Sequence, residues 1–300
     1  SFEIRFLKQI LLLLKLNLRK LILISTIISV SCLFIVSIFI LNHVIKEQLT
    51  QNSLLVNAKY ALKVANSADQ HFDDMLKELK YSTELLGQDF SNPLLRQQEA
   101  KRLTGQSNKF NSILIVDKQG RVISFAPKKL NLNPHVLYKT VGIVESLKRK
   151  STYVSHPYWS ARHNLVVLMS QPVYDRNKNY VGLVGGSIYL QKNHLIQKML
   201  STDYDFKKSY MYVIDQDSRI IFHPDRSRIG EKIINNTGLD YMISKRTGSV
   251  QLINSRGVEN LAGFAYIPSV KWIVVSQQPT EELLKQANII LLKVAVSIFI

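Results

Sequence analysis

Residues 21–41 carry no charged side chain, and no other feature limits the possible folds of this chain as strongly. The run reads LILISTIISVSCLFIVSIFIL, which is 21 residues. At about 1.5 Å per residue, a helix of this length crosses the roughly 30 Å hydrocarbon core of a bilayer. A cleaved signal peptide has a shorter apolar core followed by small residues at its cleavage site. We therefore predict a transmembrane helix over residues 21–41.

The charges beside this run predict its orientation. Residues 1–20 contain five basic side chains and one acidic one: Arg5, Lys8, Lys15, Arg19, Lys20 and Glu3. The positive-inside rule places such a flank in the cytoplasm. A second apolar run starts near Ala287 and is still apolar at Ile300. We expect residues 280–300 to form a helix that enters a second membrane span and continues past Ile300. Residues 42–286 are then extracytoplasmic.

The composition of this segment excludes several functions. It has 33 Lys and Arg against 21 Asp and Glu, or +12 of the chain's net charge of +17. The basic residues are dispersed, without zinc-finger or recognition-helix spacing, so we expect no nucleic-acid partner and favour a solvated surface near anionic lipid. Cys32 is the only cysteine, and the seven histidines lack metal-ligand spacing. We expect no catalytic, cofactor or metal site here.

Residues 42–89 predict one long helix, because they contain no Pro and their first Gly is Gly87. Mostly apolar small and large residues recur in steps of three and four: Ala58, Ala61, Ala65, Ala68, Phe72, Met75 and Leu79. Such a stripe has to be buried, either on a sheet of the same chain or against the same helix of a second chain. The pattern does not decide between these alternatives. The small residues would let two helices approach closely, and our expectation for the oligomeric state is a homodimer.

After Pro93 the sequence changes to short β-rich runs separated by turns. Strands are predicted at residues 112–116, 121–125, 153–155, 165–173 and 180–190, then at 209–214, 219–223, 249–253, 261–266 and 272–277, with helices at 191–200 and 233–244. The segments VDKQGRVI and IDQDSRII share one pattern 98 positions apart, at residues 116–123 and 214–221. We predict an α+β fold in which a long N-terminal helix carries two tandem antiparallel-sheet modules, residues 90–200 and 201–279.

This organisation resembles the double Cache sensor domains of bacterial transmembrane receptors, in which two PAS-like sheets stack along one membrane-anchored helix. The residues that carry the resemblance are the hairpin ILIVDKQGRVISF, the stretches YVSHPY and SQPVYD, the strand VGLVGGSIYL, and FHPD followed by IG. The resemblance covers residues 42–286. It implies a bacterial inner-membrane location and a small-molecule ligand in the membrane-distal module, residues 90–200.

The amino-acid-binding members of that family carry an Arg-x-Trp-Tyr motif, a Tyr-x-Asp and an Asp in a Gly-x-Asp-Ile strand, and these carboxylates hold the ligand's ammonium group. Here only Tyr158 matches, and Ser187 stands in place of the last Asp. An ammonium buried without countercharges loses its hydration without compensation. We therefore expect a ligand that is not a standard α-amino acid.

The candidate ligand-binding residues of the distal module are aromatic or basic. An arginine fork, a protonatable histidine and aromatic rings together suit an anion or an aromatic ring. Aromatic residues of short strands are more often core or rim residues, and Arg162 is the strongest candidate of the group. The six residues are Tyr153, His156, Tyr158, Trp159, Arg162 and Tyr189.

The resemblance is greatest to sensors that precede diguanylate cyclase (GGDEF) modules. It implies an output that makes cyclic di-GMP, with GTP and Mg²⁺ used by a cytoplasmic part beyond Ile300. A histidine kinase, a chemoreceptor, and a membrane-anchored binding protein without enzymatic output are the alternatives.

Overall fold

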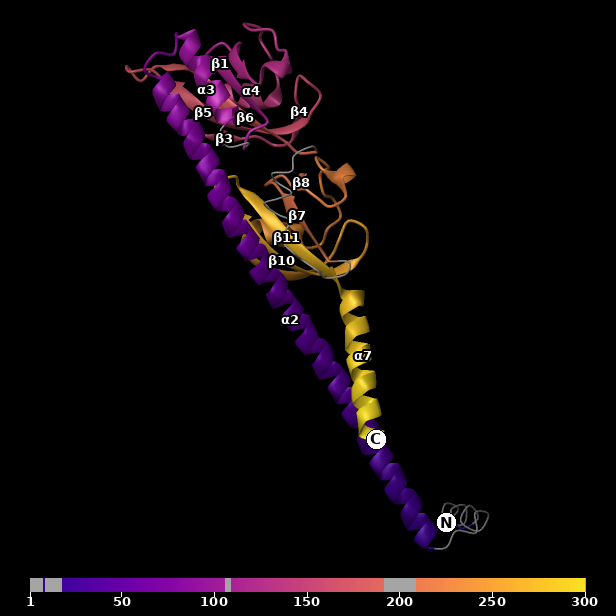
Figure 1. The fold of residues 1–300 in the computed structure, drawn as a ribbon. Helices are drawn as coiled ribbons and strands as arrows, with labels where there is room; N and C mark the ends of the chain where they lie inside the picture. Colours follow the sequence, from indigo (N-terminus) through magenta and orange to yellow (C-terminus); the bar gives the residue numbers. More distant parts are fainter. Residues whose placement is uncertain (1–7, 9–17, 106–108, 192–208, 300) are drawn as a thin grey trace. The chain divides into compact units, whose positions relative to one another are not determined.

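The computed structural model describes residue 8 and residues 18–105, 109–191 and 209–299. The chain divides into two compact units, Ser1–Gln51 with Leu283–Ile300, and Asn52–Glu282. The second unit holds both predicted modules (Figure 1). Most of the basic N-terminal flank and nearly all of the helix expected at residues 191–200 lie outside the described residues.

Helix α2, Leu18–Leu86, is one continuous helix of 69 residues. It contains both the apolar run 21–41 and the long helix predicted after it, and it ends just before Gly87. A side chain at Gly87 would collide with the carbonyl oxygen of Tyr174. Among the described residues, α2 is the one helix long and apolar enough to cross a membrane. Helix α7, Thr280–Phe299, starts where predicted, with two acidic residues in its first turn.

The distal module is a six-stranded antiparallel sheet with the order β2-β1-β6-β5-β3, in which β4 also pairs with β5. The sheet is accompanied by helix α3, Pro93–Gly105, helix α4, Val141–Arg149, and the short 3-10 helix η1, Lys128–Leu130. Its strands are β1, Ser112–Asp117; β2, Val122–Ala126; β3, Tyr153–Val154; β4, Tyr158–Trp159; β5, Leu165–Tyr174; and β6, Tyr180–Tyr189.

The proximal module repeats this plan. Its five strands follow the order β8-β7-β11-β10-β9, so the hairpin and the neighbouring long strands take the same places as in the distal sheet. The elements are β7, Tyr210–Ile214; β8, Ile220–Phe222; η2, Arg226–Arg228; α6, Leu239–Lys245; β9, Gly248–Ile253; β10, Glu259–Ile267; and β11, Trp272–Pro279. The α+β fold with two antiparallel sheets is thereby confirmed.

The sequence repeat marks the same turn in both modules. Asp117 is the last residue of β1, and its Oδ1 accepts the backbone N–H of Gln119 and of Arg121. Asp215 follows β7, and its Oδ1 accepts the N–H groups two and four residues on in the same way. The aspartate therefore recurs because one carboxylate oxygen closes the turn of each hairpin.

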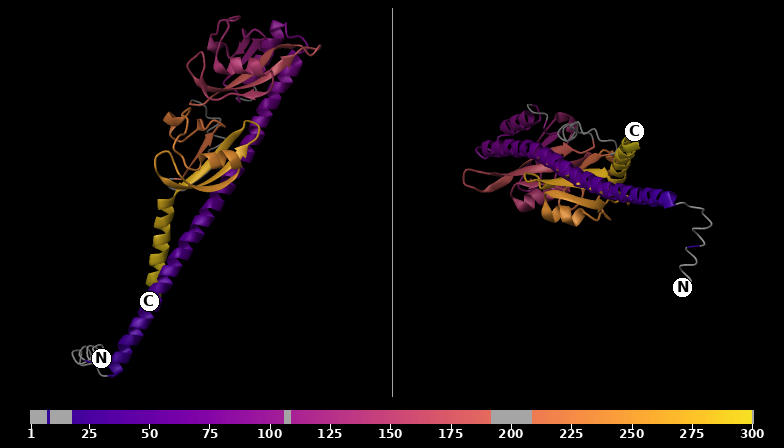
Figure 2. Two further views of the ribbon diagram at one scale, coloured as in Figure 1. Left: turned by 180° about the vertical axis from the view of Figure 1, so that it is seen from behind. Right: turned by 90° about the horizontal axis from the view of Figure 1, so that it is seen from below.

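The stripe of α2 is buried within the chain. Of the seven residues predicted to form it, Ala58 is half-buried and the other six are fully buried. They belong to one apolar cluster with residues of both sheets, including Val167 of β5 and Val274 of β11. Figure 2 shows both sheets along the same helix. The alternative of packing within one chain is the one observed, and the homodimer stays a prediction.

Close contacts fix the proximal sheet on α2. The rings of Phe72 and Trp272 meet edge to face with their centroids 4.9 Å apart. Ser276 of β11 donates a buried hydrogen bond of 2.7 Å from Oγ to Oδ1 of Asn57. Gly263 of β10 lies so close to the backbone of Asn57 and Ala58 that a Cβ there would overlap it.

Helices α3 and α4 and strand β4 were not predicted. Helix α3 buries Arg96 and Glu99 together with two apolar residues, so it lacks an apolar stripe in the sequence. Glu99 accepts a 2.7 Å hydrogen bond from Ser82 of α2, which gives this charged side chain a buried partner. Helix α6 is shorter than the predicted helix at residues 233–244, since it begins only at Leu239.

One histidine joins the two modules. His156, between β3 and β4, contacts Asp215 Oδ2 through Nδ1 at 2.8 Å and Asp217 Oδ2 through Nε2 at 3.1 Å. The hydrogen bond to Asp215 raises the pKa of His156, and the charges of both aspartates add to the effect, while partial burial and Arg219 oppose it. Protonated His156 is thus the form that binds both carboxylates.

We predict that substituting Gly263→Ala destabilises the protein by about 2 kcal/mol, because the new methyl group separates β10 from α2. Gly105→Ala is the control, since no described atom lies within 4 Å of its Cβ position. Chemical denaturation of the purified chain measures both effects. Equal stability of the two variants would contradict the close packing of β10 on α2.

We predict that His156→Gln flattens the dependence of stability on pH. Because the folded pKa is raised, the contribution of His156 is fully present below the unfolded value of about 6.5 and is lost as pH rises through the folded pKa. Wild type should therefore lose more thermal stability than H156Q between about pH 6 and pH 9. Exposed His71 on α2 provides the control H71Q, which should follow the wild type. Parallel pH profiles for wild type and H156Q would disprove the contact's role.

Candidate ligand-binding site

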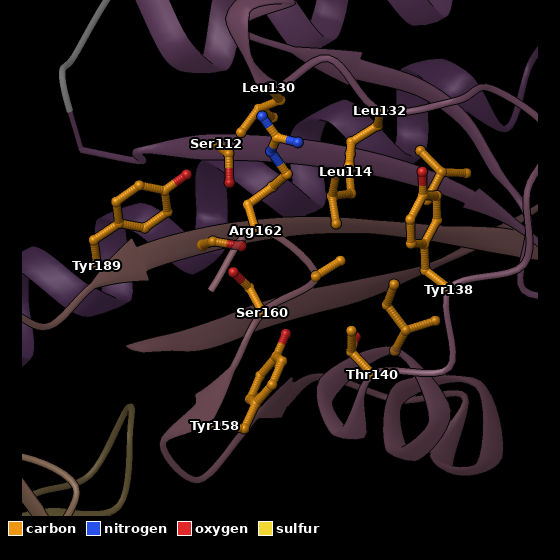
Figure 3. Close-up of a pocket in the computed structure, with 14 residues that line it drawn as sticks. Ser112, Leu114, Leu130, Leu132, Tyr138, Thr140, Tyr158, Ser160, Arg162 and Tyr189 are labelled. Atoms are coloured by element: carbon orange, nitrogen blue, oxygen red, sulfur yellow. The ribbon is translucent and has the colours of Figure 1, made fainter. Parts of the chain in front are cut away.

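The distal module contains a pocket, here called the distal cavity, with about 460 Å³ of empty space, which includes space open to solvent. Strands β1, β2, β4 and β6, the start of α4, and the turns at residues 130–132 and 160–162 enclose it (Figure 3). The lining residues are Ser112, Leu114, Val122, Leu130, Leu132, Tyr138, Thr140, Ile143, Tyr158, Ser160, Ala161, Arg162, Ser187 and Tyr189.

Strand register places three polar side chains on the wall that the sheet forms in the cavity. Ser112 of β1 pairs directly with Ser187 of β6, so both side chains reach the same face of the sheet. Tyr189 lies two residues further along β6 and therefore shares this face. A small residue at position 187 leaves room for an occupant where a larger side chain would fill the space.

Tyr158 is held by β4 and α4 together. It pairs with Val166 of β5, and its ring lies so close to Gly142 of α4 that a Cβ at residue 142 would overlap it. Burial raises the pKa of Tyr158 to about 12, although the nearby Thr140 hydroxyl acts in the opposite direction. The phenol is therefore protonated at neutral pH and available as a hydrogen-bond donor.

The turn that carries Arg162 is braced by Ser160 and Asn164. The backbone N–H of Ser160 donates to the Asn164 carbonyl at 2.9 Å, and Ser160 Oγ accepts the N–H of Asn164 at 3.2 Å. Figure 3 shows the Arg162 side chain crossing the space between the labelled residues of β1 and those of the turn at 130–132. This geometry presents a guanidinium to the cavity.

The lining combines hydroxyl donors and one cation with apolar walls. Among the described lining residues, Arg162 is the one charged side chain and none is a carboxylate. A guanidinium binds carboxylate or phosphate oxygens through paired donors, and the tyrosine rings and leucines suit an apolar group. The site can thus hold a small molecule with an anionic group and an apolar or aromatic part.

Three of the six candidate residues from the sequence meet at this cavity: Tyr158, Arg162 and Tyr189. Tyr153 and His156 instead line a groove beside the proximal module, where Arg149 stacks on the Tyr153 ring at 4.7 Å. Trp159 points to solvent with 59% of its surface exposed. Strand alternation explains the separation of Tyr158 and Trp159, since successive side chains of β4 point to opposite sides.

The remaining lining residues were not among the candidates. Tyr138 is one of them, and its hydroxyl accepts the backbone N–H of Asn133. The other polar ones are small side chains: Ser112, Thr140, Ser160 and Ser187. The pairing of Ser112 with Ser187 requires β1 and β6 to be neighbours, although 75 positions separate them. No local pattern indicates that adjacency.

Solved structures share this fold. The chain matches the ligand-binding domain of the amino-acid chemoreceptor PctB from Pseudomonas aeruginosa, in complex with L-Gln, with a TM-score of 0.58, 16% identity, and coverage of 76% of this chain and 91% of that one. The extracellular domain of the putative histidine kinase soHK1S-Z6 matches with a TM-score of 0.60, 16% identity, and 81% and 98% coverage.

An extracellular ligand-binding receptor from Desulfohalobium retbaense matches with a TM-score of 0.60 and 14% identity over 72% of this chain, which spans only 38% of that receptor chain. No curated protein sequence matches this chain. The dCache_1 family model, described as a Cache domain, matches residues 41–287. With two antiparallel sheets of the same strand order along one helix, this chain is a member of the dCache_1 family of Cache domains.

Proposed function

We propose that residues 42–286 are the extracytoplasmic ligand-sensing region of a transmembrane signalling receptor. The observation that carries this proposal is the distal cavity, where Arg162, Tyr158 and Tyr189 face a space of about 460 Å³ within a Cache fold. The apolar start of α2 supports an anchor in the membrane, with the N-terminus in the cytoplasm.

The ligand that fits the distal cavity is a small molecule with an anionic group, and not a standard α-amino acid. Some relatives do bind amino compounds: Mlp24 is solved with asparagine and PctC with GABA. Their example opposes this part of the proposal. Its support is the lining of the distal cavity, which offers Arg162 to an anion but no described carboxylate to an ammonium.

The output of the receptor is proposed as that of a chemoreceptor or a histidine kinase. Relatives with the same fold are described in these two classes, whereas none of those named here is described as a diguanylate cyclase. The cyclase output expected from the sequence therefore lacks support. Whatever the output, a ligand acts only by binding two arrangements of the sensor with different affinities.

We predict that Arg162→Gln weakens the binding of an anionic ligand about tenfold or more, because it removes charge-assisted hydrogen bonds of about 1.5–3 kcal/mol. The measurement is calorimetric titration of the purified chain with a panel of carboxylates, aromatic acids and the twenty amino acids. Arg176→Gln is the matched control. Arg176 lies exposed in the turn between β5 and β6, and its substitution changes the net charge by the same amount.

Two results of this titration would contradict the proposal. Tight binding of several unmodified amino acids, unaffected by R162Q, would overturn the ligand class. Equal losses of affinity in R162Q and R176Q would show that the overall charge, and not the distal cavity, attracts the anion.

A further inference from the structure

The proximal module has a cavity of its own at the position that corresponds to the distal cavity. This proximal cavity lies among β7, β8 and β11 and has about 230 Å³ of empty space, which includes space open to solvent. The repeat offset of 98 positions relates four lining residues of one cavity to four of the other: Ser112 to Tyr210, Leu114 to Tyr212, Val122 to Ile220, and Leu130 to Arg228. Ser187 and Gln277 also correspond, as the register partners of Ser112 and Tyr210.

Three side chains of the proximal cavity bury polar atoms that no protein group satisfies. Tyr212, His223 and Gln277 are 3%, 5% and 1% exposed. The Tyr212 hydroxyl, His223 Nε2 and both amide atoms of Gln277 have no hydrogen-bond partner among the described residues. Asn236 lies near Tyr212, and Gln277 near Tyr210, but neither pair has hydrogen-bond geometry. Buried polar groups are rarely left unpaired, so this arrangement is built for a polar occupant.

The hydrogen bonds of His223 determine which of its nitrogens donates. Nδ1 accepts the backbone N–H of Asp225 at 2.9 Å, so the proton of the neutral ring is on Nε2. Burial, helped by the charge of Arg228, lowers the pKa of His223 to about 4. At neutral pH the ring is uncharged, and its Nε2–H is a donor directed to the cavity.

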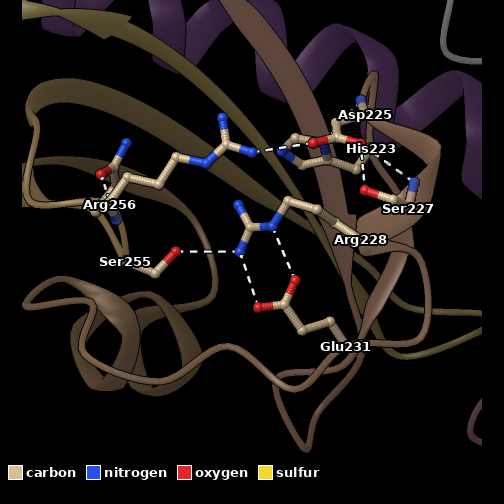
Figure 4. Close-up of polar contacts among 8 residues, drawn as sticks. His223, Asp225, Ser227, Arg228, Glu231, Ser255 and Arg256 are labelled. Carbon is tan, nitrogen blue, oxygen red and sulfur yellow. Dashed lines mark hydrogen bonds and ion pairs between the residues drawn. The ribbon is translucent and has the colours of Figure 1, made fainter.

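The charges around the cavity favour an acceptor as its occupant. Arg228 donates from Nε and Nη2 to Glu231 at 2.9 and 3.3 Å, and from Nη2 to Ser255 at 3.1 Å (Figure 4). Outside it, Arg256 pairs with Asp225 at 3.0 Å. None of the described lining residues is a carboxylate, although Glu231 beside the cavity already neutralises Arg228. The donors left unpaired on the wall are the Tyr212 hydroxyl, His223 Nε2–H and the Gln277 amide N–H.

We propose that the proximal cavity is a second ligand site, which binds a small monocarboxylate of the size of formate or acetate. The carboxylate oxygens accept from the Tyr212 hydroxyl, His223 Nε2–H and the Gln277 amide N–H, with the guanidinium of Arg228 beside them. The bulkier side chains at the corresponding positions, Tyr210 for Ser112 and Tyr212 for Leu114, leave less empty space than in the distal cavity and favour a smaller occupant. This site is additional to the proposed function of the distal cavity and does not depend on it.

The test uses the 300-residue chain in lipid nanodiscs, with acetate as the probe and chloride replacing it at constant ionic strength. Saturation-transfer NMR of the acetate methyl group and the shift of the thermal unfolding temperature both report binding. We expect saturable binding to wild type and an affinity about tenfold lower for Tyr212→Phe, which removes one donor and keeps the ring.

Two variants distinguish acetate binding at the proximal cavity from binding elsewhere on the chain. Tyr241→Phe removes an exposed hydroxyl of α6 outside the cavity, and it should bind acetate like the wild type. Arg162→Gln removes the anion-binding side chain of the distal cavity. Saturable acetate binding that remains in the R162Q background therefore belongs to another site, and adding Tyr212→Phe should lower that affinity about tenfold. Loss of binding in R162Q with retention in Y212F would assign acetate to the distal cavity and overturn the proposal. Absence of saturable binding to wild type would overturn it as well, with ordered water as the occupant.

Discussion

The burial of a single stripe of α2 is the constraint on which the rest of the sensor structure depends. Both sheets cover this stripe, and its alanines allow strand backbones to approach the helix closely. At β10 the approach is close enough to require Gly263, and at β11 a buried hydrogen bond joins Ser276 to Asn57. Among the described residues, no other long helix covers the faces of the two sheets that pack on α2, and Asn52–Glu282 is accordingly one compact unit.

The two modules use one backbone plan for different chemistry. Their strand orders agree, and an aspartate closes the first hairpin turn of each. The second carboxylate oxygen, Oδ2, has a different partner in each module. Asp117 Oδ2 binds Arg121 of the same hairpin at 2.7 Å, whereas Asp215 Oδ2 binds His156 of the other module. The same aspartate thus makes contacts only within its own hairpin in the distal module, but takes part in the contact between the modules in the proximal one.

The same divergence is visible at the cavities. Leucine and serine at the wall of the distal cavity correspond to tyrosine, arginine and glutamine at the wall of the proximal one. The larger side chains leave less empty space in the proximal cavity and bring more polar atoms to its wall. A pair of cavities that share position but differ in size and polarity is suited to two different ligands, since volume limits the occupant and donor placement selects its chemistry.

Elements with strong local signals could be predicted from the amino-acid sequence. The charge-free run, the stripe of α2 and the Asp-containing turns follow from periodicity and side-chain type, and most strands of both sheets were predictable within a few residues. Helix α3 was not, because it buries Arg96 and Glu99 in place of an apolar stripe. Three features became visible only in the folded chain: α2 is covered by its own sheets, Ser112 meets Ser187, and His156 faces the proximal module instead of the distal cavity. They could not be predicted because a sheet brings together residues far apart in the chain, and nothing local in the sequence encodes which distant strand becomes the neighbour.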